Sequence, residues 1–237
     1  MRVPFYIAAL VLAVTAAHAE MPEIQQVSAR MAETKSRESA TVRNYTVLRH
    51  YSLAVPHAGH VAEMMVRLTY TYPGHKKFDI VWERGANSLQ KRVMRKLLTA
   101  EEDASRFDTR VTADNYHFEL EGVETLNGRQ CYVLRLTPKV SNKYLLRGKA
   151  WVDAVDFAVV QVKGTPVEDG SFWIRNTQIA QQYKKVAGFW LPAMNKADSD
   201  VRIFGSAHLT IESLDYQIIP SDDENRAEVL SRRPPLE

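Results

Sequence analysis

The residues best suited to chemistry are few, and they are scattered along the chain. His57, His60 and His75 fall near the tips of two predicted strands, and three histidines could bind zinc. No cysteine or acidic residue completes the set nearby in the sequence. The spacing therefore favours no metal site and implies no cofactor.

Paired carboxylates could serve as acid and base, and Asp153 and Asp156 form such a pair. They flank a tight connection between predicted strands, where aspartate commonly accepts hydrogen bonds from its own backbone. Ser171 and Ser206 lack the sequence of a nucleophile elbow. We expect no enzyme and no catalytic residues, although a hydrolase site built from distant residues remains an alternative.

Cys131 is the only cysteine, so no internal disulfide can form. It lies in a strand-like run from Gln130 to Leu134. A nucleophile or an intermolecular disulfide is one interpretation, and a small apolar core residue is the other. No cysteine-centred motif surrounds it, which favours the core.

The first 19 residues predict export. Arg2 gives a positive start, residues 5–17 are apolar, and Ala17-His18-Ala19 is a small-residue cleavage site before Glu20. An uncleaved membrane anchor would need about 20 apolar residues, and this run is shorter. We therefore expect a cleaved signal peptide and a periplasmic protein.

The net charge and the length of the chain limit its possible partners and its number of domains. Removing residues 1–19 takes away Arg2, so the formal net charge falls from +3 to +2. That balance gives no electrostatic basis for binding nucleic acid. Residues 20–220 suffice for a single domain with a substantial core, and residues 221–237 predict a polar tail.

Two helices are predicted. The first begins near Ile24 and ends by Glu38. The second runs from about Asn87 to Asp103, and its apolar face carries Leu89, Val93, Met94, Leu97 and Leu98. Its basic residues lie mainly off that face. Such a helix could rest on anionic lipid, but its place between strands favours packing on a sheet.

Strands dominate elsewhere. Residues 43–55 alternate in polarity, with Arg49 as the exception among the apolar odd positions. Alternation continues over residues 64–72 and 78–82, and it resumes over residues 115–120 and 132–136. Further strands are predicted over residues 149–152, 157–163, 172–183, 186–191, 201–211 and 214–219. The fold class is therefore α+β, mostly β, with about ten antiparallel strands. So large a sheet with one apolar face must curl and be covered, or close on itself, and helices over the concave face of a curled sheet are the economical solution.

The order of elements and several local segments resemble a known family. These segments are Asn115–Phe118, Gly128–Leu134, Gly148–Asp153 followed by Gly164, and Gly188–Pro192. They are similar to segments of the outer membrane lipoprotein-sorting protein superfamily, which includes the LolA-like and LppX-like periplasmic carriers. The likeness covers nearly the whole chain after residue 19.

The resemblance implies an open half-barrel whose hollow receives acyl chains. The implied function is a periplasmic lipoprotein or lipid carrier, or chaperone, that holds an acyl chain between the sheet and lid helices. The alternative is a sensor domain of the same fold that acts through protein contacts. The implied partners are an acyl chain, a lipid or a lipidated protein, with membrane-bound donor and acceptor proteins. We expect a monomer.

The expected cavity residues come from inward-facing strand positions and from the second helix. They are Tyr45, Val47, Arg49, Tyr51, Leu68, Tyr70, Trp82, Leu89, Val93 and Leu97. The tryptophans Trp82, Trp151, Trp173 and Trp190 suit core packing, and some of them suit the wall of an acyl-binding hollow.

Arg49 has two interpretations. The resemblance implies that an arginine at an early inward-facing position holds the lid helices through backbone carbonyls. Alternatively, the strand lies at a sheet edge and Arg49 extends into water. Under the first interpretation, Arg49→Leu should fold normally but alter the loading or release of ligand.

Overall fold

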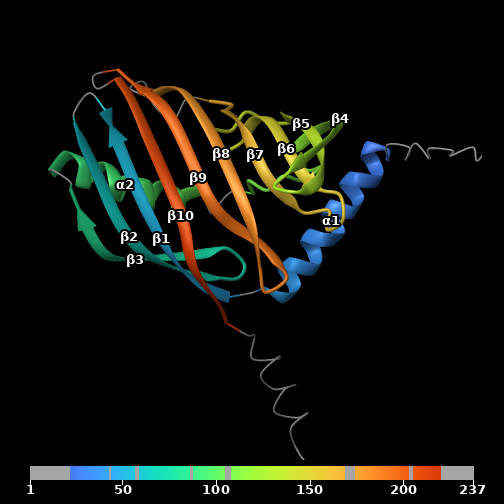
Figure 1. Ribbon diagram of the computed structural model, residues 1–237, viewed down its shortest axis with the longest axis horizontal. Coiled ribbons are helices and arrows are strands. Elements are labelled where there is room, and N and C mark those ends of the chain that lie inside the picture. Colours follow the sequence, from blue (N-terminus) through green and yellow to red (C-terminus); the bar gives the residue numbers. More distant parts are fainter. Residues whose placement is uncertain are drawn as a thin grey trace, which may run out of the picture.

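A computed structural model describes residues 22–42, 44–56, 59–85, 88–104, 108–168, 174–202 and 205–219 (Figure 1). The predicted signal peptide and C-terminal tail lie outside these residues. In the described part, no helix is long and apolar enough to cross a membrane.

The described residues form ten strands and two helices. Their bounds are α1 Ile24–Thr41, β1 Asn44–Val55, β2 His60–Thr71, β3 His75–Arg84, α2 Ser88–Ala104, β4 Tyr116–Leu126, β5 Arg129–Pro138, β6 Leu146–Asp153, β7 Val159–Pro166, β8 Ile174–Val186, β9 Phe189–Val201 and β10 Gly205–Ile219. One antiparallel sheet contains every strand in the order β3-β2-β1-β10-β9-β8-β7-β6-β5-β4. The sheet is open and curved, with β3 and β4 at its edges (Figure 1). The predicted fold class is confirmed.

Alternation of side chains builds the inner face at the β1–β3 end. In β1, Tyr45, Val47, Arg49, Tyr51 and Leu53 are buried, while the residues between them are half-exposed. Opposite them, β2 buries Ala62, Met64, Val66 and Leu68. The apolar face of α2 packs on this surface through Met94 and Leu98. The predicted packing of this helix on the sheet is confirmed.

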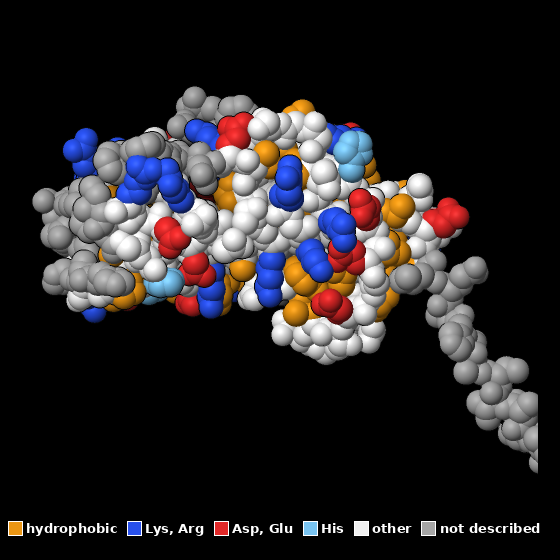
Figure 2. Space-filling view, turned by 90° about the horizontal axis from the view of Figure 1, so that it is seen from above, with side chains coloured by type: hydrophobic (Ala, Val, Ile, Leu, Met, Phe, Trp, Pro, Cys, Tyr) orange, Lys and Arg blue, Asp and Glu red, His pale blue; other side chains and the backbone are white. Residues whose placement is uncertain are grey.

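The outer side of α2 is basic. Lys91, Arg92, Arg95 and Lys96 are all exposed. Figure 2 shows blue side chains at the end of the molecule that holds α2 and also across the middle of the same face. Arg95 pairs with Glu83 of β3. These charges keep the helix amphipathic, so only its apolar face is buried.

The other end of the inner face is covered by α1. Val27 and Met31 of α1 pack against Leu134 of β5 and Val152 of β6. Thr34 Oγ1 donates a hydrogen bond to the backbone oxygen of Asp156, 2.9 Å away. The two helices thus cover opposite ends of one sheet face.

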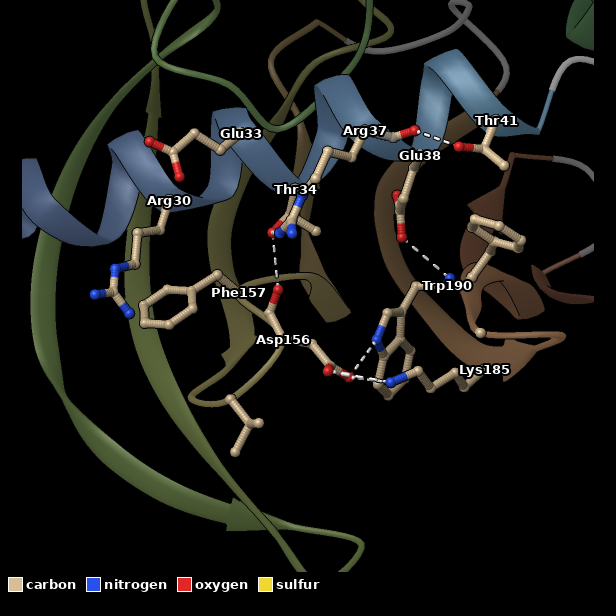
Figure 3. A pocket seen from close by; sticks show the side chains of 13 residues that line it. Arg30, Glu33, Thr34, Arg37, Glu38, Thr41, Asp156, Phe157, Lys185 and Trp190 are labelled. Atoms are coloured by element: carbon tan, nitrogen blue, oxygen red, sulfur yellow. Dashed lines mark hydrogen bonds and ion pairs between the residues drawn. The ribbon is translucent and has the colours of Figure 1, made fainter.

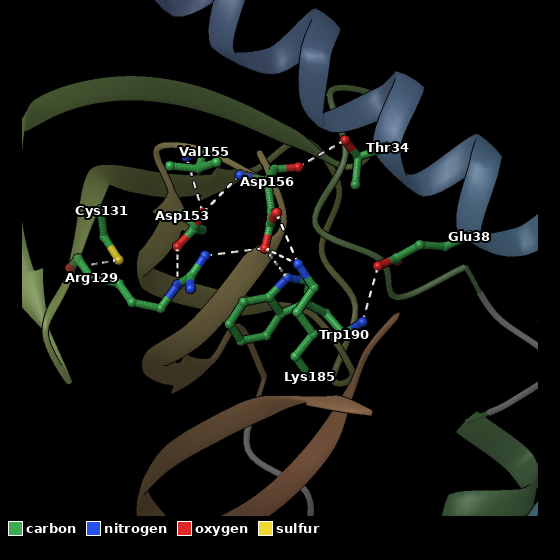
Figure 4. Close-up of polar contacts among 9 residues, drawn as sticks. All are labelled: Thr34, Glu38, Arg129, Cys131, Asp153, Val155, Asp156, Lys185 and Trp190. Atoms are coloured by element: carbon green, nitrogen blue, oxygen red, sulfur yellow. Dashed lines mark hydrogen bonds and ion pairs between the residues drawn. The ribbon is translucent and has the colours of Figure 1, made fainter. Parts of the chain in front are cut away.

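A polar cluster fixes the β6–β7 turn beneath α1 (Figure 4). Asp153 Oδ1 accepts hydrogen bonds from the backbone N–H groups of Val155 and Asp156, which is the turn chemistry predicted for this pair. Arg129 bridges both carboxylates, and Lys185 joins Asp156. Burial would raise the pKa of Asp153, but Arg129 and the backbone donors outweigh it and lower that pKa.

Cys131 lies beside this cluster. It is a free, fully buried cysteine that packs with Val133, Trp151 and Val160. Burial raises the pKa of its thiol, so the neutral form is favoured. The prediction of a core residue is confirmed.

Two predictions about the last strands of the chain, β9 and β10, were wrong. Pro192 was expected to end a strand, but β9 continues through it to Val201. Pro192 can lie within β9 because the ladder with β10 begins only at Met194, so its missing N–H breaks no pairing there.

The last predicted pair of strands is one continuous strand, β10. Val47 faces Tyr216 while Arg49 faces Ser213, so β10 carries an extra residue between these pairs. This β-bulge reverses the alternation after Ser213, which made one strand look like two in the sequence.

Candidate functional site

The helices leave a hollow over the middle of the sheet. Side chains on β8, β9 and β10 are mostly half-exposed, in contrast to the buried inner positions of β1 and β2. A cavity of about 480 Å³ lies here, and we call it the central cavity. Its apolar lining includes Leu97, Leu146, Val162, Ile179, Met194, Leu209 and Ile211.

A second cavity of about 660 Å³ adjoins the first, and both are lined by Lys76, Arg110, Tyr183 and Pro192. We call it the tyrosine pocket, because Tyr45, Tyr70 and Tyr72 also line it. The rings of Tyr45 and Tyr70 stack with centroids 4.9 Å apart. Burial raises the pKa of Tyr183 to about 12, so this wall presents a neutral phenol.

An ion cluster ties α2 to the sheet at the wall of the central cavity. Arg49 Nη1 of β1 donates to Glu101 Oε1 of α2 at 2.5 Å, and Lys76 Nζ of β3 donates to the same oxygen at 3.1 Å. Tyr51 Oη donates to Glu101 Oε2 at 3.2 Å. We call Arg49, Lys76 and Glu101 the ion cluster.

The electrostatics of the ion cluster favour its charged form. Burial would raise the pKa of Glu101, but Arg49 and Lys76 outweigh burial and lower it to about 2. Burial would likewise lower the pKa of Arg49, and the Glu101 carboxylate raises it instead. Two cations and one anion leave the ion cluster with an excess positive charge at neutral pH.

Acid should weaken this tie. The pKa of Glu101 is about 2 in the folded protein against an ordinary value of 4.5. The carboxylate therefore stabilises the fold above pH 4.5, and this contribution is lost as the pH falls towards 2. Urea unfolding between pH 7 and pH 2.5 should show a loss of unfolding free energy that is about 3 kcal/mol smaller in Glu101→Gln than in the wild type. Glu119→Gln, at an exposed site, should follow the wild type; an identical acid loss in all three proteins would contradict the assignment.

The structure separates the expected cavity residues into groups. Arg49 and Leu97 line the central cavity, and Tyr45 and Tyr70 line the tyrosine pocket. Val47, Tyr51 and Leu68 face the same side of the sheet, but they are buried in the core and line neither cavity. Whether these residues contact a ligand stays a prediction.

Trp82 and Val93 line neither of the two cavities. The register between β2 and β3 shifts at Val66, so Trp82 pairs with Met65 on the outer face. There its ring lies 5.9 Å from that of His50. Val93 is 38% exposed on α2. The side chain of Leu89 lies outside the described residues.

The edge-strand interpretation of Arg49 was wrong. Strand β1 lies between β2 and β10, and Arg49 is only 6% exposed. The family-based interpretation also needs revision, because Arg49 reaches α2 through a side-chain carboxylate. Among the described residues, its Nε has no hydrogen-bond partner although it is buried.

Glu101 and Lys76 were missed by the sequence analysis. A signal for Glu101 exists, because it follows Leu97 by four residues and Leu98 by three, on the apolar face of the helix. A carboxylate on that face requires a buried cation as its partner. Arg49, the exception in an apolar row, was the available candidate.

A groove of about 600 Å³ lies beside α1 (Figure 3), and it shares Glu38, Phe189 and Trp190 with the tyrosine pocket. Arg30, Arg37 and Glu38 of α1 face Asp156 and Trp190 across it. Glu38 accepts a hydrogen bond from the backbone N–H of Trp190, 3.1 Å away. This hydrogen bond and that of Thr34 to Asp156 join α1 to the sheet.

A metal centre finds no support within the described ranges, where no group of three His, Cys, Asp or Glu residues could hold an ion. His57 and the side chain of His60 lie outside these ranges. The two adjoining cavities are suited to a ligand by their size and lining, and the ion cluster lies at the wall of the central cavity.

A model of a family described as "Uncharacterized protein" matches residues 89–227. Comparison with curated proteins gives no significant sequence match.

Among solved structures, an outer membrane lipoprotein-sorting protein domain from Vibrio parahaemolyticus has a TM-score of 0.52 and 16% identity, over 88% of this chain and 99% of that one. A DUF1329 family protein from Desulfovibrio piger has a TM-score of 0.46 and 14% identity, over 87% and 98%. A LolA superfamily protein from Nitrosomonas europaea has a TM-score of 0.41 and 12% identity, over 84% and 95%. The chain has a LolA-like fold, as the sequence motifs indicated.

Proposed function

We propose a carrier function for this chain, which belongs to the family described as "Uncharacterized protein" and has the LolA-like fold. In this proposal, the protein works in the periplasm and holds an acyl chain non-covalently between the sheet and α2. The observation that carries the proposal is the central cavity, a hollow with many apolar lining residues on a sheet face whose two ends are covered by helices.

The size and lining of the cavity support an acyl ligand. A volume of about 480 Å³ lies within the range of about 300–1,000 Å³ typical of small-molecule sites. Each methylene moved from water into an apolar site contributes about 0.8 kcal/mol. Ten methylenes would contribute about 8 kcal/mol before the costs of association are subtracted. Such a ligand needs no catalytic group.

The ion cluster supports a gating role for α2. Glu101 joins this helix to two different strands, β1 through Arg49 and β3 through Lys76. Movement of α2 away from the sheet would enlarge the entrance to the central cavity, because Leu97 and Glu101 both line it. Loading and release would then depend on breaking these ion pairs.

Filling the cavity should block binding. In Ile179→Trp, the indole ring would occupy part of the central cavity. The affinity for dodecanol should then fall at least about tenfold, because two or more of its methylenes would no longer be buried there. Isothermal titration without detergent measures this affinity. Native mass spectrometry of protein purified without detergent should reveal a co-purified acyl compound in the wild type.

A matched control is the neighbouring residue on β8. Gln178 is exposed, so Gln178→Trp adds the same ring outside the cavity and should bind dodecanol as the wild type does. Equal affinity in both variants would place binding elsewhere. No binding by the wild type, together with consistently empty protein in native mass spectra, would reject the carrier proposal.

A further inference from the structure

The ion cluster holds more positive than negative charge, and an anionic ligand could balance it. Arg49 and Lys76 share a single carboxylate, that of Glu101. Arg49 is buried, and its Nε has no hydrogen-bond partner among the described residues. A buried donor without a partner is costly, and an acceptor supplied by a ligand would remove that cost.

The rest of the central cavity adds to this positive charge. Arg110 and Lys143 also line it. Arg110 is neutralised by Asp108, at 2.7 Å. Lys143 lies 4.9 Å from the centre of the Tyr144 ring, and no carboxylate of the described residues pairs with it. Counting these groups with the ion cluster, three cations face one carboxylate.

We propose that the central cavity selects amphiphiles with an anionic head group, a carboxylate or phosphate on an acyl or alkyl chain, and that this head group binds Arg49 and Lys76 in place of Glu101. The inference rests on the proposed carrier function and adds the class of ligand. Arginine and lysine bind such oxygens through charge-assisted hydrogen bonds. In this arrangement, the apolar lining residues contact the acyl or alkyl chain, and Arg49 and Lys76 bind the anionic head group.

Replacement of Glu101 links binding to the position of α2. Glu101 joins α2 to both Arg49 and Lys76, so an anion that occupies these cations removes both ion pairs. The apolar contacts of Met94 and Leu98 would remain. Binding of an anionic amphiphile should therefore loosen the end of α2 near Glu101, while a neutral amphiphile should leave it in place.

The test compares ligands that share one chain length. Isothermal titration would use dodecyl phosphate, dodecanol, dodecyltrimethylammonium and inorganic phosphate. A salt concentration of about 0.15 M screens long-range electrostatic attraction. Dodecyl phosphate should bind about tenfold more tightly than dodecanol, and the cationic amphiphile should bind most weakly. Hydrogen exchange near Glu101 should increase with dodecyl phosphate and stay unchanged with dodecanol.

Variants of Lys76 make the test specific. Lys76→Gln should lose most of the preference for dodecyl phosphate and keep its affinity for dodecanol, and Lys76→Arg should restore the preference. Lys77→Gln is the matched control, because Lys77 is exposed on the same strand and pairs with Asp79. It should behave as the wild type does.

Each failure has a distinct meaning. Equal affinity for the three amphiphiles would overturn this inference and leave the carrier function intact. Inorganic phosphate that binds as tightly as dodecyl phosphate would also overturn it, because a simple anion site needs no chain. No binding of any amphiphile would reject both the inference and the proposed function.

Discussion

Gly148→Ala is expected to lower the free energy of unfolding by about 4 kcal/mol or more. Gly148 of β6 pairs with Gly164 of β7 on the inner face. A Cβ at Gly148 would lie 2.6 Å from the Cα of Gly164 and would overlap the backbone oxygen of Lys163. Backbone atoms in the middle of a sheet cannot move aside cheaply, so the strands would have to separate.

Urea unfolding measures the loss, and Gly128→Ala is the control. Gly128 lies in the β4–β5 hairpin with φ +78°, and no heavy atom lies within 4 Å of the position of an added Cβ. This substitution carries only the backbone cost of the left-handed region, about 1 kcal/mol. A similarly small loss in Gly148→Ala would show that the two strands can separate without penalty.

The glycine pair also bears on the candidate site. Gly164 is the register partner of Ile179, which lines the central cavity. Without side chains, β6 and β7 approach each other closely on the inner face at this point. We expect Gly148→Ala to impair acyl binding as well as stability, since the substitution changes the wall next to Ile179.

The sequence predicted those parts of the fold that depend on regular alternation. The inner face was predicted to carry Tyr45, Val47, Arg49 and Tyr51 of β1 and Leu68 of β2, and the structure places them there. Both helices were also predicted close to their observed bounds. In each case, the apolar period of the sequence matches the geometry of the element.

The errors arose where the sheet departs from regular geometry. Trp82 was assigned to the inner face because it continues the even positions of its strand, but the register shift at Val66 turns it outwards. The bulge in β10 after Ser213 divided one strand into two predicted ones. A bulge adds one residue and reverses the alternation, and no residue type marks it in a single sequence.

The candidate site was predicted only in part, because its polar members come from distant elements. Arg49 stood out as a charge within an apolar row. Lys76 lies in β3 and Glu101 lies in α2, and nothing in their local sequence relates them to Arg49. Only the packing of α2 on the β1–β3 end of the sheet brings the three together.

Arg49→Leu is expected to lower the free energy of unfolding by about 3 kcal/mol, which changes the initial expectation that this variant would fold normally. Glu101 is only 22% exposed and would retain Lys76 alone as its cationic partner. Removing one member of a buried ion pair leaves a charge that is poorly solvated and poorly paired. Urea unfolding at pH 7 measures the loss.

The double variant Arg49→Leu/Glu101→Leu separates the cost of an unpaired charge from the cost of lost packing. It removes both buried charges, and Lys76, at 22% side-chain exposure, can reach water. Replacing a whole buried pair by apolar residues is often neutral, so most of the lost stability should return. A double variant less stable than Arg49→Leu would instead show that Glu101 stabilises the fold without Arg49. If the double variant is stable, α2 would keep its apolar contacts through Met94 and Leu98 and its exposed ion pair between Arg95 and Glu83. Faster exchange of acyl ligands by this variant would then show that the ion cluster controls gating.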